Sequence, residues 1–553
     1  MVTQLVPKLA SGSQKISQTF KFNLRFLFIV LLSLGIALRC ANIDGKVYWF
    51  DESFTSLRIS GYTEEEVIQH ISDQEILTAK DFLRYQQIND EKGLADTIKG
   101  LAIEEPQLTP LYFIAARLWA QWFGNSIVVV RSLSVLFSLL IFPVAYWLCL
   151  ELFNSKLVGW VAISTIAISP LHLLFAQEAR PYSLWVLTLL ISSTALLRAI
   201  RRQTKVAWIT YSISVAIGLY SFLFFGLGII SHGIYILIAE RFRFRKTLLS
   251  YLLAILVGVI IFSPWIIVIL TNPNPMVSLG SRGVELSLLV KAWIHNLSLT
   301  VFDFDLGWCF PIGSSYCRSA LTLRNVLLYL MLPALCLAGY SIYFLCRHTQ
   351  RRVWGFVVTM IGTTIAFLAV PDVILGGHRS SITRYLFPIF LGIQLSFAYL
   401  LSSQAFSASA NTKIRKFWKL VAALLISLGV LSCMRISQAD SWWNKAQNYH
   451  VIPMAHVLNS VEAPFLIYPV SPGIGFVGRV MPLFHELNPE TKIQFVPQSI
   501  ETIKVPNGLE NIFIFNPSQP VIEQFQKIDD YSIELVFINP IHPSPRLWKI
   551  EKT

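Results

Sequence analysis

Long apolar runs separated by short basic clusters dominate this chain. Each run holds roughly 17 to 24 residues, enough to cross a hydrocarbon layer of about 30 Å. Hydrophobic residues make up 54% of the 553 residues and charged residues only 14%. With a mean hydropathy of +0.57, this composition excludes an ordinary soluble protein. The sequence therefore predicts a polytopic α-helical membrane protein, with runs near 24–41, 126–149, 157–175, 182–199, 206–222, 223–239, 247–270, 324–346, 353–371, 385–402 and 418–436.

The basic clusters predict the topology. Lys and Arg gather in the N-terminal region and in the segments 201–205, 240–246, 346–352 and 411–416, as expected for cytoplasmic loop ends. About eleven crossings with the N-terminus inside place all of them on one side. The net charge of +13 is thereby explained by topology, and we expect no nucleic-acid partner.

Two stretches are ambiguous by hydropathy alone. Residues 206–239 are continuously apolar, but a single helix of that length would measure about 50 Å, so we expect two short helices that meet near 220–226. Residues 109–124 are apolar but short and contain Arg117. Counting them as a crossing would put the cluster 201–205 outside, so we expect an amphipathic or re-entrant external helix.

The external side is expected to carry most of the remaining chain. A loop at 42–125 follows the first helix, which we expect to stay uncleaved because "ALRCA" lacks the small residues of a cleavage site. From residue 437 the pattern changes to short β-rich runs separated by turn residues. We therefore predict a membrane domain at 1–436 and a small extracytoplasmic α/β domain at 437–553, whose strands include "FLIYPV", "KIQFVP", "NIFIFNP", "IELVFIN" and "RLWKI".

Two of the seven cysteines, Cys309 and Cys317, fall in one external loop. They are expected to form a disulfide if that compartment is oxidising. The other cysteines lie in or beside apolar helices, where a small buried side chain is the ordinary role.

Three external segments carry the candidate chemistry. Asp51 and Glu52 follow the first helix and either start an external helix or take part in catalysis. Glu178 and Arg180 lie in the short turn between the third and fourth crossings and either snorkel at the boundary or enter the same site. The third segment holds His378, Arg379 and Arg384, which are either interfacial anchors or binders of an anionic lipid group.

The order of these motifs resembles a known family. "DE" after the first helix, "TPLYFIAARLWAQWFGNSIVVVRSLSVLF", "FAQEARPYSLWVL" and "RYLFP" together are similar to GT-C glycosyltransferases of family 39, which are related to protein O-mannosyltransferases and to the aminoarabinose transferases of lipid A. The resemblance covers residues 20 to 400. One departure is Leu108, which stands where many relatives have His.

The resemblance implies a GT-C fold and a cell-envelope glycosyltransferase that moves a hexose or pentose from a polyprenyl-phosphate donor to a lipid, glycan or protein acceptor. The enzyme would lie in the plasma (inner) membrane, act on its outer side and invert the sugar. The implied catalytic residues are Asp51, Glu52 and Glu178. The substrate-binding residues are Arg180, Tyr182, His378, Arg384 and Tyr385, joined by Arg131, which lies near the start of its helix and is expected to face the site.

Two points stay open at this stage. The countercharge for the leaving phosphate could come from Arg180, Arg384, His378 or a divalent metal, for which Asp51 and Glu178 are the candidate ligands. The alternative functions are a lipid-linked glycan transporter or flippase and a polysaccharide ligase or polymerase. A transporter would place charges along a path at mid-bilayer, whereas here the ionisable residues gather at the outer helix ends.

Overall fold

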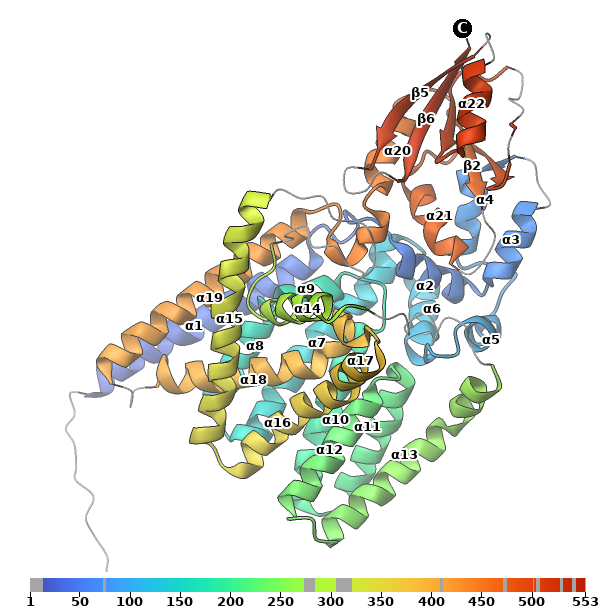
Figure 1. The fold of residues 1–553 in the computed structure, drawn as a ribbon. Helices are drawn as coiled ribbons and strands as arrows, with labels where there is room; N and C mark the ends of the chain where they lie inside the picture. The colour runs from blue at the N-terminus through green and yellow to red at the C-terminus, as the bar shows by residue number, and fades with distance from the viewer. Residues whose placement is uncertain are drawn as a thin grey trace, which may run out of the picture.

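The computed structural model describes residues 13–72, 76–272, 284–304, 321–407, 411–470, 475–500, 502–503, 508–527, 531–539 and 544–552. Cys309 and Cys317 lie outside the described residues. A bundle of long helices forms the lower body of the molecule, and a small mixed sheet with its helices stands above it (Figure 1). The predicted fold class, a helical membrane protein with a small α/β domain, is therefore confirmed.

Every predicted apolar run is helical, although the run 157–175 divides into α8 and α9, and the run 353–371 passes from α16 through the π-helical η3 (Ile365–Ala369) into α17. The helices are α1 (Ser13–Cys40), α7 (Ile127–Phe153), α8 (Lys156–Ala167), α9 (Pro170–Ala176), α10 (Tyr182–Arg202), α11 (Lys205–Ser221), α12 (Phe225–Ala239), α13 (Lys246–Thr271), α15 (Leu321–His348), α16 (Arg351–Thr364), α17 (Val370–Leu375), α18 (Phe387–Gln404) and α19 (Thr412–Gln438). As predicted, residues 206–239 divide into two helices, α11 and α12, at residues 222–224.

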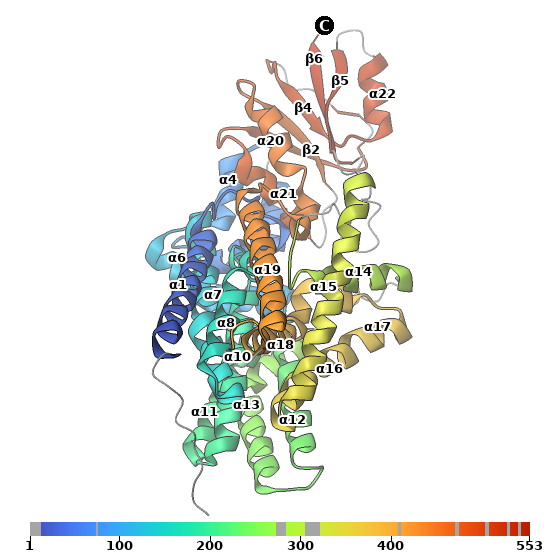
Figure 2. The same cartoon turned by 90° about the vertical axis from the view of Figure 1, so that its left-hand side faces the viewer.

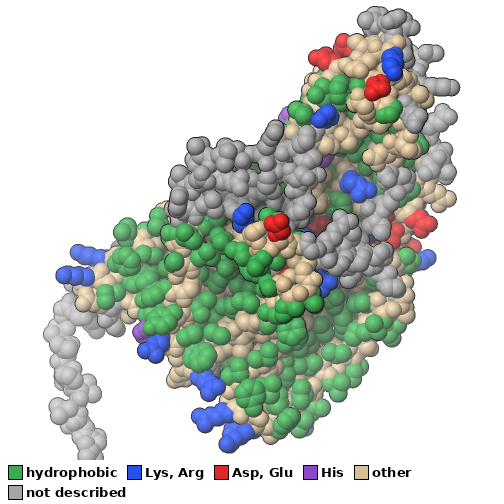
Figure 3. Space-filling view, viewed as in Figure 1, with side chains coloured by type: hydrophobic (Ala, Val, Ile, Leu, Met, Phe, Trp, Pro, Cys, Tyr) green, Lys and Arg blue, Asp and Glu red, His purple; other side chains and the backbone are tan. Residues whose placement is uncertain are grey.

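The number of crossings is not settled by length and composition alone. Among the described residues, six helices are long and apolar enough to cross a membrane, or seven if the bent pair α8 and α9 is one span. The remaining predicted crossings fall on α1, α11, α12 and α15, so about eleven crossings stay a prediction. Figure 3 shows a broad band of hydrophobic side chains over the bundle, with Lys and Arg along its lower and left edges, the distribution expected of a multi-pass membrane protein.

A proline and a buried arginine lie at the bend between α8 and α9. The two helices meet at 60°, and Pro170 at the start of α9 cannot donate the backbone hydrogen bond that would continue α8. Arg39 of α1 is fully buried and donates to the carbonyl oxygens of Ile166 and Ala167 at 3.0 and 2.7 Å. It thereby satisfies acceptors at the end of α8. The bend leads the chain through α9 toward the turn that carries Glu178.

The loop after α1, predicted to be external, folds into short helices and one short strand. Their bounds are α2 (Phe50–Ser60), α3 (Glu64–Ser72), β1 (Leu77–Thr78), α4 (Ala79–Leu83), α5 (Leu94–Glu104) and α6 (Leu111–Phe123). Helix α6 corresponds to the predicted external segment 109–124. Its Arg117 is buried and donates to the carbonyl of Ile59 at 2.6 Å, while Trp122 and Phe123 are exposed at its end.

The C-terminal domain contains all the predicted strands. Its elements are α20 (Val451–Asn459), β2 (Phe465–Val470), α21 (Phe476–Glu486), β3 (Lys492–Pro497), β4 (Ile512–Phe515), α22 (Gln519–Lys527), β5 (Tyr531–Ile538) and β6 (Arg546–Lys552). The strand order is β1-β3-β2-β4-β6-β5. Strand β2 is parallel to β3 and β4, and the other pairs are antiparallel.

The loop after α1 and the C-terminal domain form one continuous structure. Strand β1 pairs with β3, with Leu77 opposite Ile493. Glu64 of α3 accepts hydrogen bonds from the backbone N–H groups of Gly475 and Val477 at the start of α21, at 3.1 and 2.9 Å, where a carboxylate also compensates the helix dipole. The domain above the bundle (Figure 2) is therefore attached to the loop that carries Asp51. We still propose that the membrane domain ends at residue 436 and that the C-terminal domain begins at residue 437.

Candidate active site

Both neighbouring acids lie in the first turn of α2. Trp49 precedes the helix in an extended conformation, and Glu52 Oε2 accepts from the Trp49 backbone N–H at 3.5 Å. The helix ends at Gly61, whose φ of 91° lies in the left-handed region. The carboxylates therefore do start a helix, as the simpler interpretation held, but their side chains have different surroundings.

Glu52 is fully buried in a cluster of charges. Its Oε1 and Oε2 each receive a hydrogen bond of 2.8 Å from Arg131. Oε2 also accepts from the Lys445 ammonium at 2.7 Å, and Oε1 accepts from the Ala179 backbone N–H at 2.9 Å. Burial by itself raises the pKa of Glu52, but Arg131 and Lys445 outweigh it and lower the pKa to about 2. The cluster joins α2, α7, the turn before α10 and the segment after α19.

Asp51 faces a cavity and is only partly exposed. Its Oδ2 accepts from Arg384 Nη1 at 3.1 Å and from the Tyr182 hydroxyl at 3.2 Å. Arg180 Nε lies 3.8 Å from the same oxygen, and Arg180 Nη1 donates to the Asp51 backbone carbonyl at 3.0 Å. Three of the predicted substrate-binding residues, Arg180, Tyr182 and Arg384, therefore approach one carboxylate oxygen of Asp51.

Glu178 is the second acid of the site and is completely buried. Its Oε1 accepts a hydrogen bond from the Asn444 side chain, whereas its Oε2 has no hydrogen-bond partner in the part of the chain that the structure describes. Burial raises the pKa of Glu178 to about 8, although Lys445 acts in the opposite direction. At neutral pH this side chain is therefore mainly a protonated carboxylic acid, able to donate a hydrogen bond.

The turn that holds Glu178 is fixed by a buried lysine. Lys46 donates to the Gln177 side chain at 2.7 Å, and Gln177 in turn donates to the carbonyl of Ala41 at 2.8 Å. Burial and the nearby Lys445 lower the pKa of Lys46 to about 7. These contacts bind the turn after α9 to the chain leaving α1.

The cavity between these elements measures about 320 Å³. Four of its lining residues carry a buried polar atom without a hydrogen-bond partner among the described atoms: Trp49 Nε1, Glu178 Oε2, His378 Nδ1 and Asn444 Oδ1. Buried polar atoms are normally paired, so this wall suits a ligand that carries several hydroxyl groups. The complete lining is Trp49, Phe50, Asp51, Phe175, Glu178, His378, Ser381, Ile382, Thr383, Arg384, Trp443, Asn444, Ala446 and Gln447.

The segment between α17 and α18 closes one side of the cavity. Asp372 in the first turn of α17 accepts from the Ser380 backbone N–H at 2.5 Å, which fixes the turn that contains His378. The Arg384 guanidinium lies over the Tyr182 and Tyr385 rings at 5.6 and 5.7 Å. Tyr385 stacks on Phe224, at the junction of α11 and α12, with ring centroids 4.1 Å apart.

The predicted site residues divide into two groups. Asp51, Glu178, His378 and Arg384 line the cavity, and Arg180, Tyr182 and Tyr385 contact Asp51 or Arg384. Glu52 and Arg131 instead lie buried behind Asp51, where each satisfies the other, and neither lines the cavity. Their position indicates that they orient the site.

The segment after α19 contributes residues that the sequence did not single out. Trp443, Asn444 and Lys445 belong to a short helix, η6 (Trp443–Asn448). They lie more than 390 positions from Glu52 in the chain, so no local spacing reveals the contact. The sequence offered one signal for this segment: Lys445 is a cation that stands among aromatic and amide residues, shortly after the last apolar run.

A divalent metal held by Asp51 and Glu178 stays a prediction. The described part of the chain has no group of three His, Cys, Asp or Glu side chains that could hold one. Two guanidinium groups approach Asp51, and such cationic neighbours disfavour a divalent cation, which prefers charged oxygen ligands.

Comparison with known proteins supports the predicted resemblance. Residues 105–268 match the family model described as dolichyl-phosphate-mannose-protein mannosyltransferase. The matched segment contains Glu178, Arg180 and Tyr182 and ends in α13. The resemblance predicted from the sequence is confirmed for this part of the chain. A search of curated proteins finds no match.

Solved structures with similar folds include ArnT from Cupriavidus metallidurans bound to undecaprenyl phosphate, at 12% identity and a TM-score of 0.48, covering 94% of this chain and 97% of that chain. The apo oligosaccharyltransferase of Archaeoglobus fulgidus has 14% identity and a TM-score of 0.48, covering 84% of this chain and 64% of that chain. A mutant of the mycobacterial arabinofuranosyltransferase AftD has 11% identity and a TM-score of 0.44, covering 95% and 41%.

Proposed function

We propose that this chain, whose residues 105–268 match the dolichyl-phosphate-mannose-protein mannosyltransferase model, is a membrane glycosyltransferase. It transfers a sugar from a polyprenyl-phosphate donor to an acceptor hydroxyl. The reaction takes place at the cavity beside Asp51, on the outer face of the plasma (inner) membrane. The side is inferred from the basic clusters at the other end of the bundle.

A single observation carries this proposal: the cavity is cationic beside Asp51, and its lining also presents buried polar atoms without a hydrogen-bond partner among the described atoms. Arg384 lines the cavity and suits a phosphate group, because a guanidinium group can donate two hydrogen bonds to phosphate oxygens. Arg180 adds positive charge beside Asp51. Trp49, Glu178 and Asn444 suit the hydroxyl groups of a sugar. A lipid-linked sugar phosphate combines both chemistries in one molecule.

Asp51 is assigned as the general base. Its carboxylate takes the proton of the acceptor hydroxyl as that oxygen forms a bond to the anomeric carbon. The bond from the anomeric carbon to the phosphate oxygen breaks, and polyprenyl phosphate leaves with the electron pair. Attack opposite the leaving group inverts the anomeric centre. General-base assistance of this kind contributes about 10² to 10⁴ in rate.

The arginines stabilise the charge that develops on the leaving phosphate. Arg384 lies 3.1 Å from Asp51, so one guanidinium serves both the base and the leaving group. Such charge stabilisation is strongest when donors are fixed before the reaction. The Tyr182 hydroxyl donates to the same Asp51 oxygen and thereby helps to fix the Asp51 carboxylate before the reaction.

Glu178 is assigned to the sugar. Because it is mainly protonated at neutral pH, it can donate through its carboxyl group, while Asn444 holds its other oxygen. Glu52, Arg131 and Lys445 act as positioning residues that fix the start of α2 and therefore the direction of Asp51.

The proposal is tested by comparing surface glycans and glycolipids in native cells, in cells lacking this chain, and in deleted cells that express wild-type protein or Asp51→Asn. Mass spectrometry should show a missing sugar in the deletion, restored by wild type and not by Asp51→Asn. The control is Asp44→Asn, an exposed acid in the same loop, which should restore the sugar. Full restoration by Asp51→Asn at normal protein levels would reject the assignment.

A further inference from the structure

A second cavity lies at the end of the bundle opposite the candidate active site. Its volume is about 240 Å³, and it is formed by the ends of α10 and α12 and the beginnings of α13 and α16. These helix ends lie at the lower side of the bundle in Figures 1 and 2, away from the sheet. Its lining combines the apolar Ile200, Ile236, Ile238, Ala239 and Gly355 with Tyr235, Glu240, Thr247, Arg351 and Arg352. We call this cavity the basic pocket.

The basic pocket carries an excess of positive charge. The two segments beside it, 240–246 and 351–352, hold six Lys or Arg residues and one Glu. Glu240 is paired with Arg245 at 3.2 Å, so its carboxylate is neutralised within its own loop. Arg351 and Arg352 are exposed, and Arg352 interacts with the hydroxyl of the buried Tyr235. An anionic ligand would balance this charge.

The loop that borders the basic pocket has a strained backbone. Arg241 and Phe242 have φ values of 55° and 58°, a left-handed conformation that is unfavourable for residues other than glycine. The loop leaves Phe242 and Phe244 72% and 89% exposed, alternating with basic residues. Exposed aromatic rings beside basic side chains are typical of a loop that lies at the membrane interface.

We propose that the basic pocket binds the phosphate headgroup of an anionic phospholipid. Arg351 and Arg352 would bind the phosphate oxygens, and the isoleucines would contact the glycerol and the first acyl carbons. Basic pockets between helices on the cytoplasmic side are suited to such headgroups. A lipid fits better than a soluble phosphate because Ile200, Ile236 and Ile238 give the pocket an apolar wall and Phe242 and Phe244 place its rim at the interface. This site is independent of the proposed transfer reaction.

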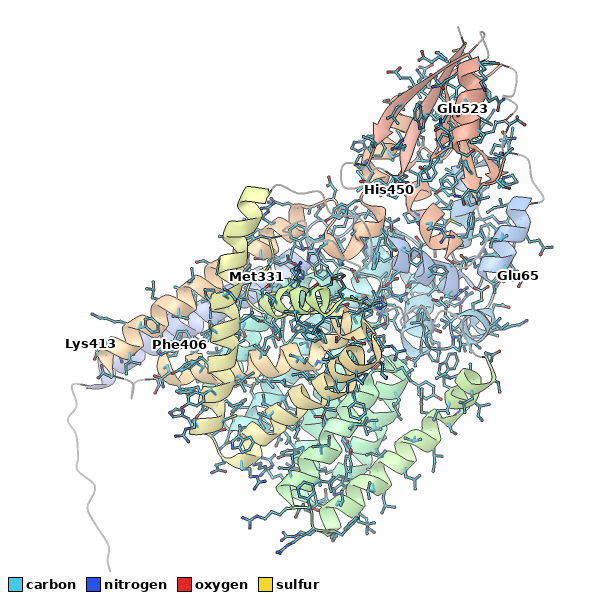
Figure 4. The ribbon with its side chains drawn as sticks, in the orientation of Figure 1. Glu65, Met331, Phe406, Lys413, His450 and Glu523 are labelled. Carbon is cyan, nitrogen blue, oxygen red and sulfur yellow. The ribbon has the colours of Figure 1, made fainter. Side chains whose placement is uncertain are left out.

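The test uses the full-length protein in detergent and measures lipid binding and thermal stability. Native mass spectrometry and the apparent Tm are recorded with added phosphatidylglycerol, phosphatidylcholine or inorganic phosphate. The test variant is Arg351→Gln with Arg352→Gln. The control variant is Lys413→Gln with Arg415→Gln, which removes two cations near the start of α19, at the far side of the bundle (Figure 4).

Phosphatidylglycerol should bind and raise the Tm of the wild type and of the control, whereas phosphatidylcholine should not. The test variant should bind phosphatidylglycerol at least about tenfold more weakly, as expected from losing charge-assisted hydrogen bonds. If it does not fold, as shown by its Tm in phosphatidylcholine, the variant Arg351→Lys with Arg352→Lys replaces it. That variant should also bind more weakly because lysine cannot form paired contacts with phosphate.

Three results would overturn the proposal. The first is unchanged phosphatidylglycerol binding in the folded test variant. The second is equal stabilisation by phosphatidylcholine. The third is stabilisation by inorganic phosphate without any response to phosphatidylglycerol, which would identify a soluble anion as the occupant.

Discussion

Replacing Glu52 by Gln should destabilise the protein far more than the loss of an ordinary ion pair. Glu52 is fully buried and compensates two buried cations, Arg131 and Lys445. In Glu52→Gln both cations remain buried without a carboxylate. Removing one partner of a buried ion pair costs about 3 to 5 kcal/mol.

The pKa of Glu52 gives a similar magnitude. It falls from 4.5 to about 2 on folding, which corresponds to about 3 kcal/mol of stability. Because the folded pKa is depressed, this stability is present above pH 4.5 and is lost as the pH falls toward 2. The free energy of unfolding of the wild type should therefore decrease as the pH falls over this range. In Glu52→Gln the part of this decrease that comes from protonating Glu52 should be absent.

The control is Glu66→Gln in the same loop after α1. Glu66 also forms an ion pair, with Lys92, but its side chain is 41% exposed, and exposed pairs contribute about 0 to 1 kcal/mol. The assay is the free energy of unfolding of each variant, from denaturant titration in detergent at pH 7, supported by the apparent Tm from tryptophan fluorescence. If Glu52→Gln is no less stable than Glu66→Gln, the buried cluster does not hold α2 in place.

The remaining predictions concern turnover. Because the pKa of Glu178 is about 8 and its protonated form is assigned to the sugar, wild-type turnover should fall as the pH rises through 8. Glu178→Gln should keep activity without that alkaline decrease; the same decrease in Glu178→Gln would exclude this role. Arg384→Ala should lower kcat at saturating donor by about tenfold or more, because one charge-assisted hydrogen bond to the leaving phosphate is lost. Arg384→Lys should be less affected. An effect on KM alone would mean that Arg384 only binds the donor. Because guanidinium groups supply the countercharge, EDTA should leave turnover unchanged, and a loss that Mg²⁺ or Mn²⁺ restores would contradict this.

The sequence predicted those parts of the fold that depend on local patterns. Apolar runs determine helices because a membrane-embedded backbone must satisfy its own hydrogen bonds. The β-rich runs after residue 437 became strands for a similarly local reason, since they alternate with turn residues. The division of residues 206–239 into two helices followed from length and charge, and the structure confirms it.

The site was predicted only in part, because burial and distant contacts are not local. Asp51 and Glu52 are adjacent, and nothing in their spacing tells which side chain faces the cavity. The distinction comes from Arg131 and Lys445, which approach Glu52 from α7 and from the segment after α19. The contact of Asn444 with Glu178 and the pairing of β1 with β3 are long-range contacts of the same kind.

The central claim is that Asp51 takes the proton of the acceptor. The most direct measurement is the single-turnover rate of purified Asp51→Asn, with the donor and acceptor identified from the glycan comparison, against wild type and Asp44→Asn. If Asp51 is the general base, Asp51→Asn should bind the donor and stay folded but lose at least about 10² in rate, while Asp44→Asn should match wild type. A wild-type rate in Asp51→Asn would contradict it.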